Sequence, residues 1–168
     1  MNTTTTGNRP RLSFYHANGK CTGCAAYFEL YPAHDCADGS IRLRLAAQKA
    51  PENPDNMLVF PSFDWERGIS VRLTFDDLCR MLQVFRGEVE SLADGKGIFH
   101  HSRRAFTALR LCHVVEPCSC FKLEAHERVN DSQNETTLAI FLTPSEALGL
   151  QLAIESSMGL IAFGVPNA

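Results

Sequence analysis

Long hydrophobic runs and a surplus of positive charge are both missing from this 168-residue chain. The longest apolar runs are far too short to cross a bilayer. The segment Met1 to Gly7 has neither the basic start nor the apolar core of a signal peptide. We therefore expect a protein that has no membrane partner, is not secreted, and is cytoplasmic, or nucleoid-associated if bacterial. We expect residues 1–10 to be a disordered lead and residues 11–168 to form a single domain.

The charge balance argues mildly against a nucleic-acid partner. Lys and Arg number 16 against 19 Asp and Glu, for a net charge of −3, whereas phosphate contacts are made by Lys and Arg. The charges are segregated along the chain, however. Acidic residues concentrate in 88–94 and 127–135, and basic residues recur at 42–44, 67–72 and 103–110. A segregated pattern of this kind still allows one positive face.

Catalytic signatures are missing as well. The chain has no P-loop, dinucleotide-binding fingerprint or zinc-protease helix. His100, His101 and His113 are residue types that serve as bases or metal ligands, but no nucleophile or orienting acid stands near them at motif spacing. We therefore expect no enzymatic activity and no cofactor, and we expect His100 to make a structural hydrogen bond.

Cysteine, by contrast, is plentiful, with seven residues. Cys21-x-x-Cys24 together with Cys118-x-Cys120 suggests a zinc site, but the second pair lacks the two intervening residues that a zinc knuckle usually has. Disulfides are not expected without a secretory signal. We predict reduced, metal-free thiols, and a structural zinc loop at Cys21 and Cys24 is the alternative.

Alternation of apolar and polar residues predicts two sets of strands. Ile41–Gln48 is the clearest example, because Ile and Leu occupy one face while Arg and Gln occupy the other. A polar, mobile loop is expected at Glu127–Glu135. The remaining predicted strands are Arg11–Ala17, Ala25–Tyr31, a long extended stretch Met57–Leu73 interrupted at Pro61, Gly97–His101, Phe106–Val115, Phe121–His126 and Thr136–Leu142.

Two helices are predicted from their capping residues. Thr74 and Asp77 form a variant capping box ahead of an apolar stripe that Gly87 ends. Thr143 to Glu146 opens a second helix, which runs to about Ala162 and is apolar nearly all round. Such a helix needs cover on several sides, from surrounding sheets or from another subunit. The order strands, helix, strands, helix predicts an α+β protein with antiparallel sheets.

Several short motifs follow one another in an order that is familiar from one family. They are Tyr15–Lys20 with Ala25-Ala26, Phe63-Asp64-Trp65, Ile98-Phe99-His100, Thr143–Glu146 and Gly164. This order resembles the Whirly family of single-stranded DNA-binding proteins and the related mitochondrial guide-RNA-binding proteins. The sequence departs from the family pattern where Cys21-Thr22-Gly23-Cys24 interrupts its Gly-Lys-Ala-Ala, and where Phe163-Gly164-Val165 replaces its aromatic-Gly-Trp ending.

The resemblance implies a fold and an assembly. Each protomer would have two antiparallel four-stranded β-sheets packed across each other with two helices, and four protomers would form a homotetramer. Single-stranded DNA would lie along the sheet surfaces and between protomers, with little sequence preference.

Single-strand binding without sequence preference needs cations along the backbone and aromatic rings for the bases. The plainer interpretation is a solvated sheet face for the cations and a core position for the rings. The candidate cations are Arg42, Arg44, Arg72, Arg110 and Lys122 on polar strand faces, with Lys20 from the first motif, and the candidate stacking groups are Tyr15, Tyr27, Phe63 and Trp65.

The sequence therefore predicts a single-stranded DNA-binding homotetramer that acts in replication, repair or recombination. RNA binding by the same fold is one alternative, because stacking does not exclude the 2′-hydroxyl. An oligomeric scaffold that binds protein partners, or a metal through its cysteines, is an alternative from another class.

Overall fold

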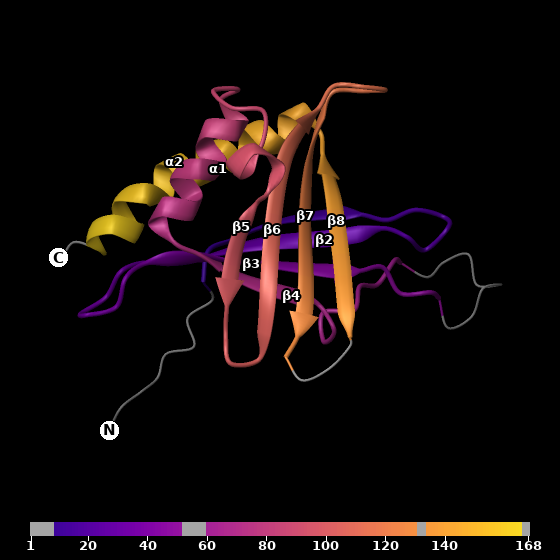
Figure 1. Ribbon diagram of the computed structural model, residues 1–168, viewed down its shortest axis with the longest axis horizontal. Coiled ribbons are helices and arrows are strands. Elements are labelled where there is room, and N and C mark those ends of the chain that lie inside the picture. Colours follow the sequence, from indigo (N-terminus) through magenta and orange to yellow (C-terminus); the bar gives the residue numbers. More distant parts are fainter. Residues whose placement is uncertain (1–8, 52–59, 131–133, 166–168) are drawn as a thin grey trace.

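The computed structural model describes residues 9–51, 60–130 and 134–165. Two four-stranded antiparallel sheets cross each other, and two helices pack together at one end of the crossing (Figure 1). This arrangement confirms the expected α+β fold of crossed sheets. No helix within these ranges is long and apolar enough to cross a membrane.

Each sheet keeps its strands in sequence order, and every neighbouring pair is antiparallel. Sheet 1 contains β1 (Arg11–His16), β2 (Cys24–Tyr31), β3 (Ser40–Ala47) and β4 (Ile69–Leu73). Sheet 2 contains β5 (Ile98–His101), β6 (Ala105–Val114), β7 (Cys120–Val129) and β8 (Glu135–Leu142).

The core lies between the inner faces of the two sheets and under the helices. Leu43 and Leu45 of β3 are fully buried, and so are Leu109 of β6 and Leu123 of β7. Because successive side chains of a strand point to opposite faces, burying these leucines turns their neighbours outward. On β3 this exposes Arg42, so each sheet keeps an outer face for polar chemistry.

Both helices begin with the predicted capping boxes. α1 (Phe75–Phe85) follows Thr74, whose side chain accepts from the Asp77 amide while Asp77 accepts from the Thr74 amide. α2 (Pro144–Phe163) follows Thr143, which exchanges the same pair of bonds with Glu146. Gly87 has a φ of 70° just beyond α1, and Gly164 caps α2 with a φ of 79°. The expected ends of both helices are therefore confirmed. A short 3-10 turn, η1 (Leu92–Gly95), leads into sheet 2.

The predicted extended stretch Met57–Leu73 is wrong for most of its described length. Only Ile69–Leu73 forms a strand, while residues 57–59 lie outside the described ranges. Phe63 makes a single bridge to Gln48, and the chain then bends where the Arg67 amide donates to Asp64 Oδ1 over 3.2 Å. Pro61 has no amide to donate to a ladder, and the Asp64 turn redirects the chain toward β4.

The predicted loop Glu127–Glu135 is also partly wrong. β7 continues to Val129, because Glu127 pairs with Thr107 of β6 and Arg128 pairs with Glu135 of β8. Ladder hydrogen bonds on both sides outweigh the polar composition that suggested a loop. Residues 131–133 lie outside the described ranges.

The expected disordered lead falls largely on residues 1–8, which lie outside the described ranges. Its last two residues are packed on sheet 1. The Arg9 guanidinium carbon lies 4.2 Å from the centre of the Tyr31 ring, and the Pro10 carbonyl accepts from the Leu30 amide over 3.0 Å. The expectation of disorder is therefore wrong for Arg9 and Pro10.

Candidate nucleic-acid interface

All four predicted stacking residues gather on the outer face of sheet 1. We call Tyr15, Tyr27, Phe63 and Trp65 the aromatic face. The rings of Tyr15 and Phe63 have centres 5.8 Å apart, and those of Tyr27 and Trp65 are 5.0 Å apart. Tyr15 is 59 % exposed and the other three are half-buried, so none belongs to the core. The core interpretation of these aromatics is therefore wrong, because Phe14, between Ser13 and Tyr15, takes the inner position.

The segment before β4 places two of these rings. The Asp64 amide donates to the Ala47 carbonyl over 2.8 Å, and the Lys49 amide donates to the Ser62 carbonyl at the same distance. These bonds hold Phe63 and Trp65 beside the end of β3. β1 and β2 supply Tyr15 and Tyr27 at alternating positions of an antiparallel ladder.

Arginines surround the aromatic face. Arg44 donates to the Tyr27 hydroxyl over 3.4 Å and to the Trp65 carbonyl, which holds it beside these two residues. Arg42 is exposed, and its guanidinium carbon lies 4.7 Å from the centre of the Tyr31 ring. Arg11 lies at the same distance over Tyr27. Cations held against rings keep their charge available to an anion while their orientation is fixed.

Arg72 joins this set from the neighbouring strand. Its Nη2 donates to the Asp38 carbonyl over 2.9 Å, and its Nε donates to Ser40 Oγ over 3.2 Å. Arg72 also stands directly across from Arg42 in the β3–β4 ladder. Sheet 1 therefore brings together three of the predicted cations and all four predicted rings.

The other predicted strand cations lie on sheet 2 and are neutralised there. Arg110 Nη1 lies 3.2 Å from Glu124 Oε1, and Lys122 Nζ lies 2.6 Å from Oε2 of the same carboxylate. The hydrogen bond from Lys122, with a smaller contribution from Arg110, lowers the pKa of Glu124. The acid therefore stays ionised at neutral pH and opposes phosphate binding at these two cations.

Lys20 lies in the exposed turn between β1 and β2, off the strand faces. The Asn18 side-chain oxygen accepts from the amides of Lys20 and Thr22 over 3.0 and 3.1 Å. This turn contains most of the segment between Lys20 and Ala25 that interrupts the family's Gly-Lys-Ala-Ala pattern. Cys21 takes a φ of 55° within it.

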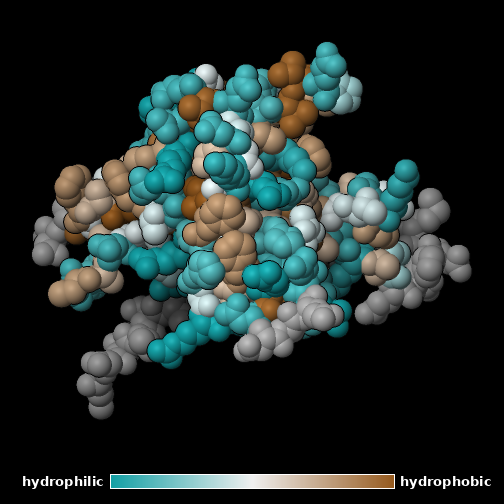
Figure 2. All heavy atoms as spheres, viewed as in Figure 1, coloured by the Kyte–Doolittle hydropathy of each residue, from teal (hydrophilic) through white to brown (hydrophobic). Residues whose placement is uncertain are grey.

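A second aromatic group was not predicted. On the outer face of sheet 2, Phe99 stacks on Phe106 with ring centres 5.6 Å apart, and His101 lies 4.7 Å from Phe106. The Arg128 guanidinium carbon is 5.9 Å from the Phe106 ring centre. Figure 2 shows apolar side chains gathered among hydrophilic ones over this face. The alternation of Phe99 and His101 was a local signal, but only the strand register places Phe106 and Arg128 beside them.

The structure does not provide the hydrogen bond expected for His100. Its Nε2 is buried and has no hydrogen-bond partner, and Asp77 Oδ2 lies 3.6 Å away. The same Asp77 oxygen already accepts from the Thr74 amide and hydroxyl, over 2.9 and 2.8 Å. The α1 capping box therefore uses the same carboxylate oxygen that lies within ion-pair distance of the imidazole.

The seven cysteines are free thiols, and the two predicted pairs differ in exposure. Cys24 is buried, and burial raises its pKa to about 11 despite a backbone hydrogen bond from Ala46. Cys118 is exposed, and Cys21 and Cys120 are half-buried. Across residues 9–51, 60–130 and 134–165, no group of three or more His, Cys, Asp or Glu side chains is arranged to hold a metal ion.

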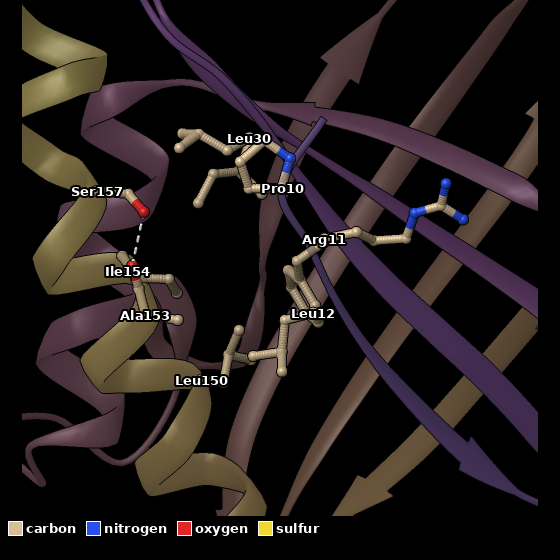
Figure 3. Close-up of a pocket in the computed structure, with 10 residues that line it drawn as sticks. Pro10, Arg11, Leu12, Leu30, Leu150, Ala153, Ile154 and Ser157 are labelled. Carbon is tan, nitrogen blue, oxygen red and sulfur yellow. Dashed lines mark hydrogen bonds between the residues drawn. The ribbon is translucent and has the colours of Figure 1, made fainter. Parts of the chain in front are cut away.

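A pocket of about 220 Å³ lies between α2 and strands β1 and β2 (Figure 3). Leu12, Leu30 and Leu150 give it an apolar lining, and the Ser157 hydroxyl donates to the Ala153 carbonyl over 2.7 Å. Arg11 also borders the pocket, but its guanidinium extends away from α2 in Figure 3, toward the outer face of sheet 1. The lining offers no nucleophile paired with a base.

The fold and its outer faces define a class of crossed-sheet proteins. No protein-family model and no curated protein matches the chain. WHY3 from Arabidopsis thaliana matches it with a TM-score of 0.72 and 14 % identity, over 92 % of this chain and 89 % of that chain. WHY1 from the same plant matches it with a TM-score of 0.72 and 13 % identity, over 92 % of this chain and 86 % of that chain. A chain from a guide-RNA-binding protein complex bound to a guide RNA matches it with a TM-score of 0.61 and 16 % identity, over 89 % of this chain and 90 % of that chain. The chain therefore has the fold of the Whirly and guide-RNA-binding proteins, and the resemblance drawn from its motifs is confirmed at the level of fold.

Proposed function

We propose that this protein binds single-stranded nucleic acid, with DNA as its first substrate, largely without sequence preference. The aromatic face and its arginines carry the proposal, because they put stacking rings and unneutralised cations on one accessible surface. Each base has a flat face that a ring can stack on, and each phosphate has a charge that a guanidinium can meet. The proposed setting is DNA exposed in replication, repair or recombination, in the cytoplasm or nucleoid.

The geometry favours single strands over duplexes. In a duplex the bases are stacked on one another, so rings standing on a flat sheet have no base face to reach. The rings of the aromatic face are paired with one another and with Arg44 and Arg11, which leaves little freedom to read base edges. This arrangement supports weak base preference.

We also propose that the protein assembles as a homotetramer through α2. The outward stripe of α2 contains Leu148 and Leu152, which are 54 % and 52 % exposed, and no charged residue. Gly149 and Gly159 lie on the same stripe, and nothing stands within 4 Å of where their Cβ atoms would be. Glycine in a helix interior costs about 1 kcal/mol relative to alanine. No contact in the described protomer requires it here, so close approach by another copy accounts for it.

The test is fluorescence anisotropy with labelled single-stranded DNA, duplex DNA and single-stranded RNA of equal length. We expect the tightest binding to single-stranded DNA, with an affinity that falls as salt rises, by about 0.7 logarithmic units per tenfold salt for each phosphate contacted. Equal affinity for the duplex contradicts the proposal. Tighter binding to RNA selects the alternative, which the guide-RNA-bound neighbour makes worth testing.

A further inference from the structure

A polar cleft of about 430 Å³ lies at the β4 edge of sheet 1, where that edge meets sheet 2. Arg42 and Arg72 line it from sheet 1, and His100, Thr107 and Glu127 line it from sheet 2. The cleft therefore combines two guanidiniums with one carboxylate and with neutral groups that exchange hydrogen bonds with a polar ligand. It is separate from the apolar pocket beside α2.

The two arginines form an unneutralised pair. They stand directly opposite each other in the β3–β4 ladder, a position where like charges repel. Within the described ranges neither forms an ion pair with a carboxylate. Glu29, the other cross-strand neighbour of Arg42, instead accepts a hydrogen bond from the Tyr31 hydroxyl over 2.7 Å. The groups that orient the two guanidiniums are all neutral: the Tyr31 ring, Ser40 Oγ and the Asp38 carbonyl.

The opposite wall includes His100 and Thr107 of sheet 2. His100 Nε2 is buried, forms no hydrogen bond, and lies 3.6 Å from the Asp77 carboxylate. The preference of the cleft for an anion therefore rests on the arginine pair, whose mutual repulsion a negatively charged ligand relieves.

We propose that this cleft binds a phosphomonoester, either the terminal phosphate of a single strand or the phosphate of a free nucleotide. A phosphomonoester carries a charge of about −1.5 to −2 at neutral pH, which matches two guanidiniums better than the single charge of a backbone diester. Guanidinium groups also bind such oxygens through two parallel hydrogen bonds. Glu127 is placed to accept from a sugar hydroxyl. The strand-end case rests on the proposed function, whereas the nucleotide case does not.

The experiment compares oligo-dT strands with a phosphate at one end, at the other end, or at neither end, all with the same internal fluorophore. Anisotropy titrations use the full chain and the variants Arg72→Gln, Arg42→Gln and Lys96→Gln. Lys96 is exposed and outside the cleft, so its variant controls for the loss of one positive charge. The readout is the ratio of affinities with and without the terminal phosphate, which cancels any general effect of a variant on strand binding. Melting temperatures check that each variant is folded.

We expect the phosphate at one of the ends to tighten binding about fivefold or more. The ratio should fall to about 1 in Arg72→Gln and Arg42→Gln, because each loses one of the two cations, and stay unchanged in Lys96→Gln. A wild-type ratio of 1 at both ends overturns the strand-end proposal, and a ratio that survives both arginine substitutions places the phosphate elsewhere.

A second arm separates this site from the proposed function. Thymidine monophosphate should raise the melting temperature of the wild-type protein, and thymidine should not, because only the former carries the phosphate. The stabilisation should disappear in Arg72→Gln. If no strand binds but this pattern holds, the proposed function fails while the cleft assignment stands. If strands bind but neither a terminal phosphate nor the monophosphate has any effect, the cleft assignment fails alone.

Discussion

Glu124 forms ion pairs with two of the predicted cations on sheet 2, and its negative charge weakens their attraction for a polyanion. Replacing it with glutamine removes the negative charge and frees Arg110 and Lys122. We expect Glu124→Gln to tighten single-strand binding by up to about fivefold, the factor that corresponds to about 1 kcal/mol for one close charge pair in water. Anisotropy titration at low salt measures the change, with the exposed Glu90→Gln as a control for net charge. Unchanged or weaker binding would show that the strand avoids this part of sheet 2.

Individual residues differed in how far the sequence could place them. The alternation in β3 correctly predicted that Arg42 and Arg44 share a face, because side-chain direction in a strand is a local property. It could not show that Arg110 meets the Glu124 carboxylate, since that follows from the register of β6 on β7, whereas Lys122 lies two residues from Glu124 on the same face of β7. The arginine pair of the cleft depends in the same way on the register of β3 on β4.

At the scale of the element, the start of α2 makes stability depend on pH. Burial raises the pKa of Glu146, but hydrogen bonds from His16 and from the Thr143 amide and hydroxyl outweigh it and hold the pKa below the ordinary 4.5. A carboxyl with a lowered folded pKa contributes stability that is complete above its unfolded value and is lost as pH falls through the folded value.

The corresponding variant is Glu146→Gln, which preserves the side-chain shape that a capping box accepts. We expect it to cost about 0.3–1 kcal/mol near neutral pH, the usual value of a charge at a helix N-terminus. The difference in unfolding free energy from wild type should shrink as pH falls below 4.5. Urea denaturation at several pH values provides the measurement, and a difference that stays constant down to acid pH would contradict this role of the charge.

A substitution on the exposed stripe of α2 should stabilise the protomer and destabilise the assembly. Gly149 has room for a methyl group within the protomer, so Gly149→Ala should stabilise the isolated helix by up to about 1 kcal/mol. If another α2 packs closely there, the same methyl group should weaken the tetramer. Light scattering across a dilution series measures the assembly, and a tetramer unaffected by Gly149→Ala would place the interface elsewhere.

A charged substitution on the same stripe is the stronger test of assembly. Leu152→Glu should dissociate the tetramer, because a buried, unpaired carboxylate is costly in an interface. Thr136→Glu, at an exposed position of β8, is the matched control and should leave the mass unchanged. A wild-type protein that is monomeric at micromolar concentration would contradict the assembly outright.

Most element positions followed from the sequence, and the failures share one physical cause. Periodicity and capping residues located both α-helices and six of the eight strands of the described structure closely, because those signals are local. Residues 60–68 were misassigned because their conformation is set by a turn at Asp64 and by bonds to the end of β3. β7 extends beyond its predicted end because its final residues pair with two neighbouring strands.

At the scale of the whole molecule, the net charge of −3 and the proposed polyanion partner are reconciled by where the charges lie. Sheet 1 keeps Arg11, Arg42 and Arg72 outside carboxylate ion pairs in the described structure, while the acids of sheet 2 and the helices pair with cations there. Binding should therefore depend steeply on salt despite the acidic total. The aromatic face is the central element of this arrangement.

Trp65 gives direct access to that face, because it is the only tryptophan in the chain and stands against Tyr27. The decisive measurement is its intrinsic fluorescence during titration with oligo-dT, with anisotropy of a labelled strand followed in parallel. We predict that Trp65 emission is quenched along the same curve as strand binding, since a base stacks on or beside the indole, and that duplex DNA leaves it unchanged. Strand binding that saturates without any change in Trp65 emission would contradict the assignment of this face.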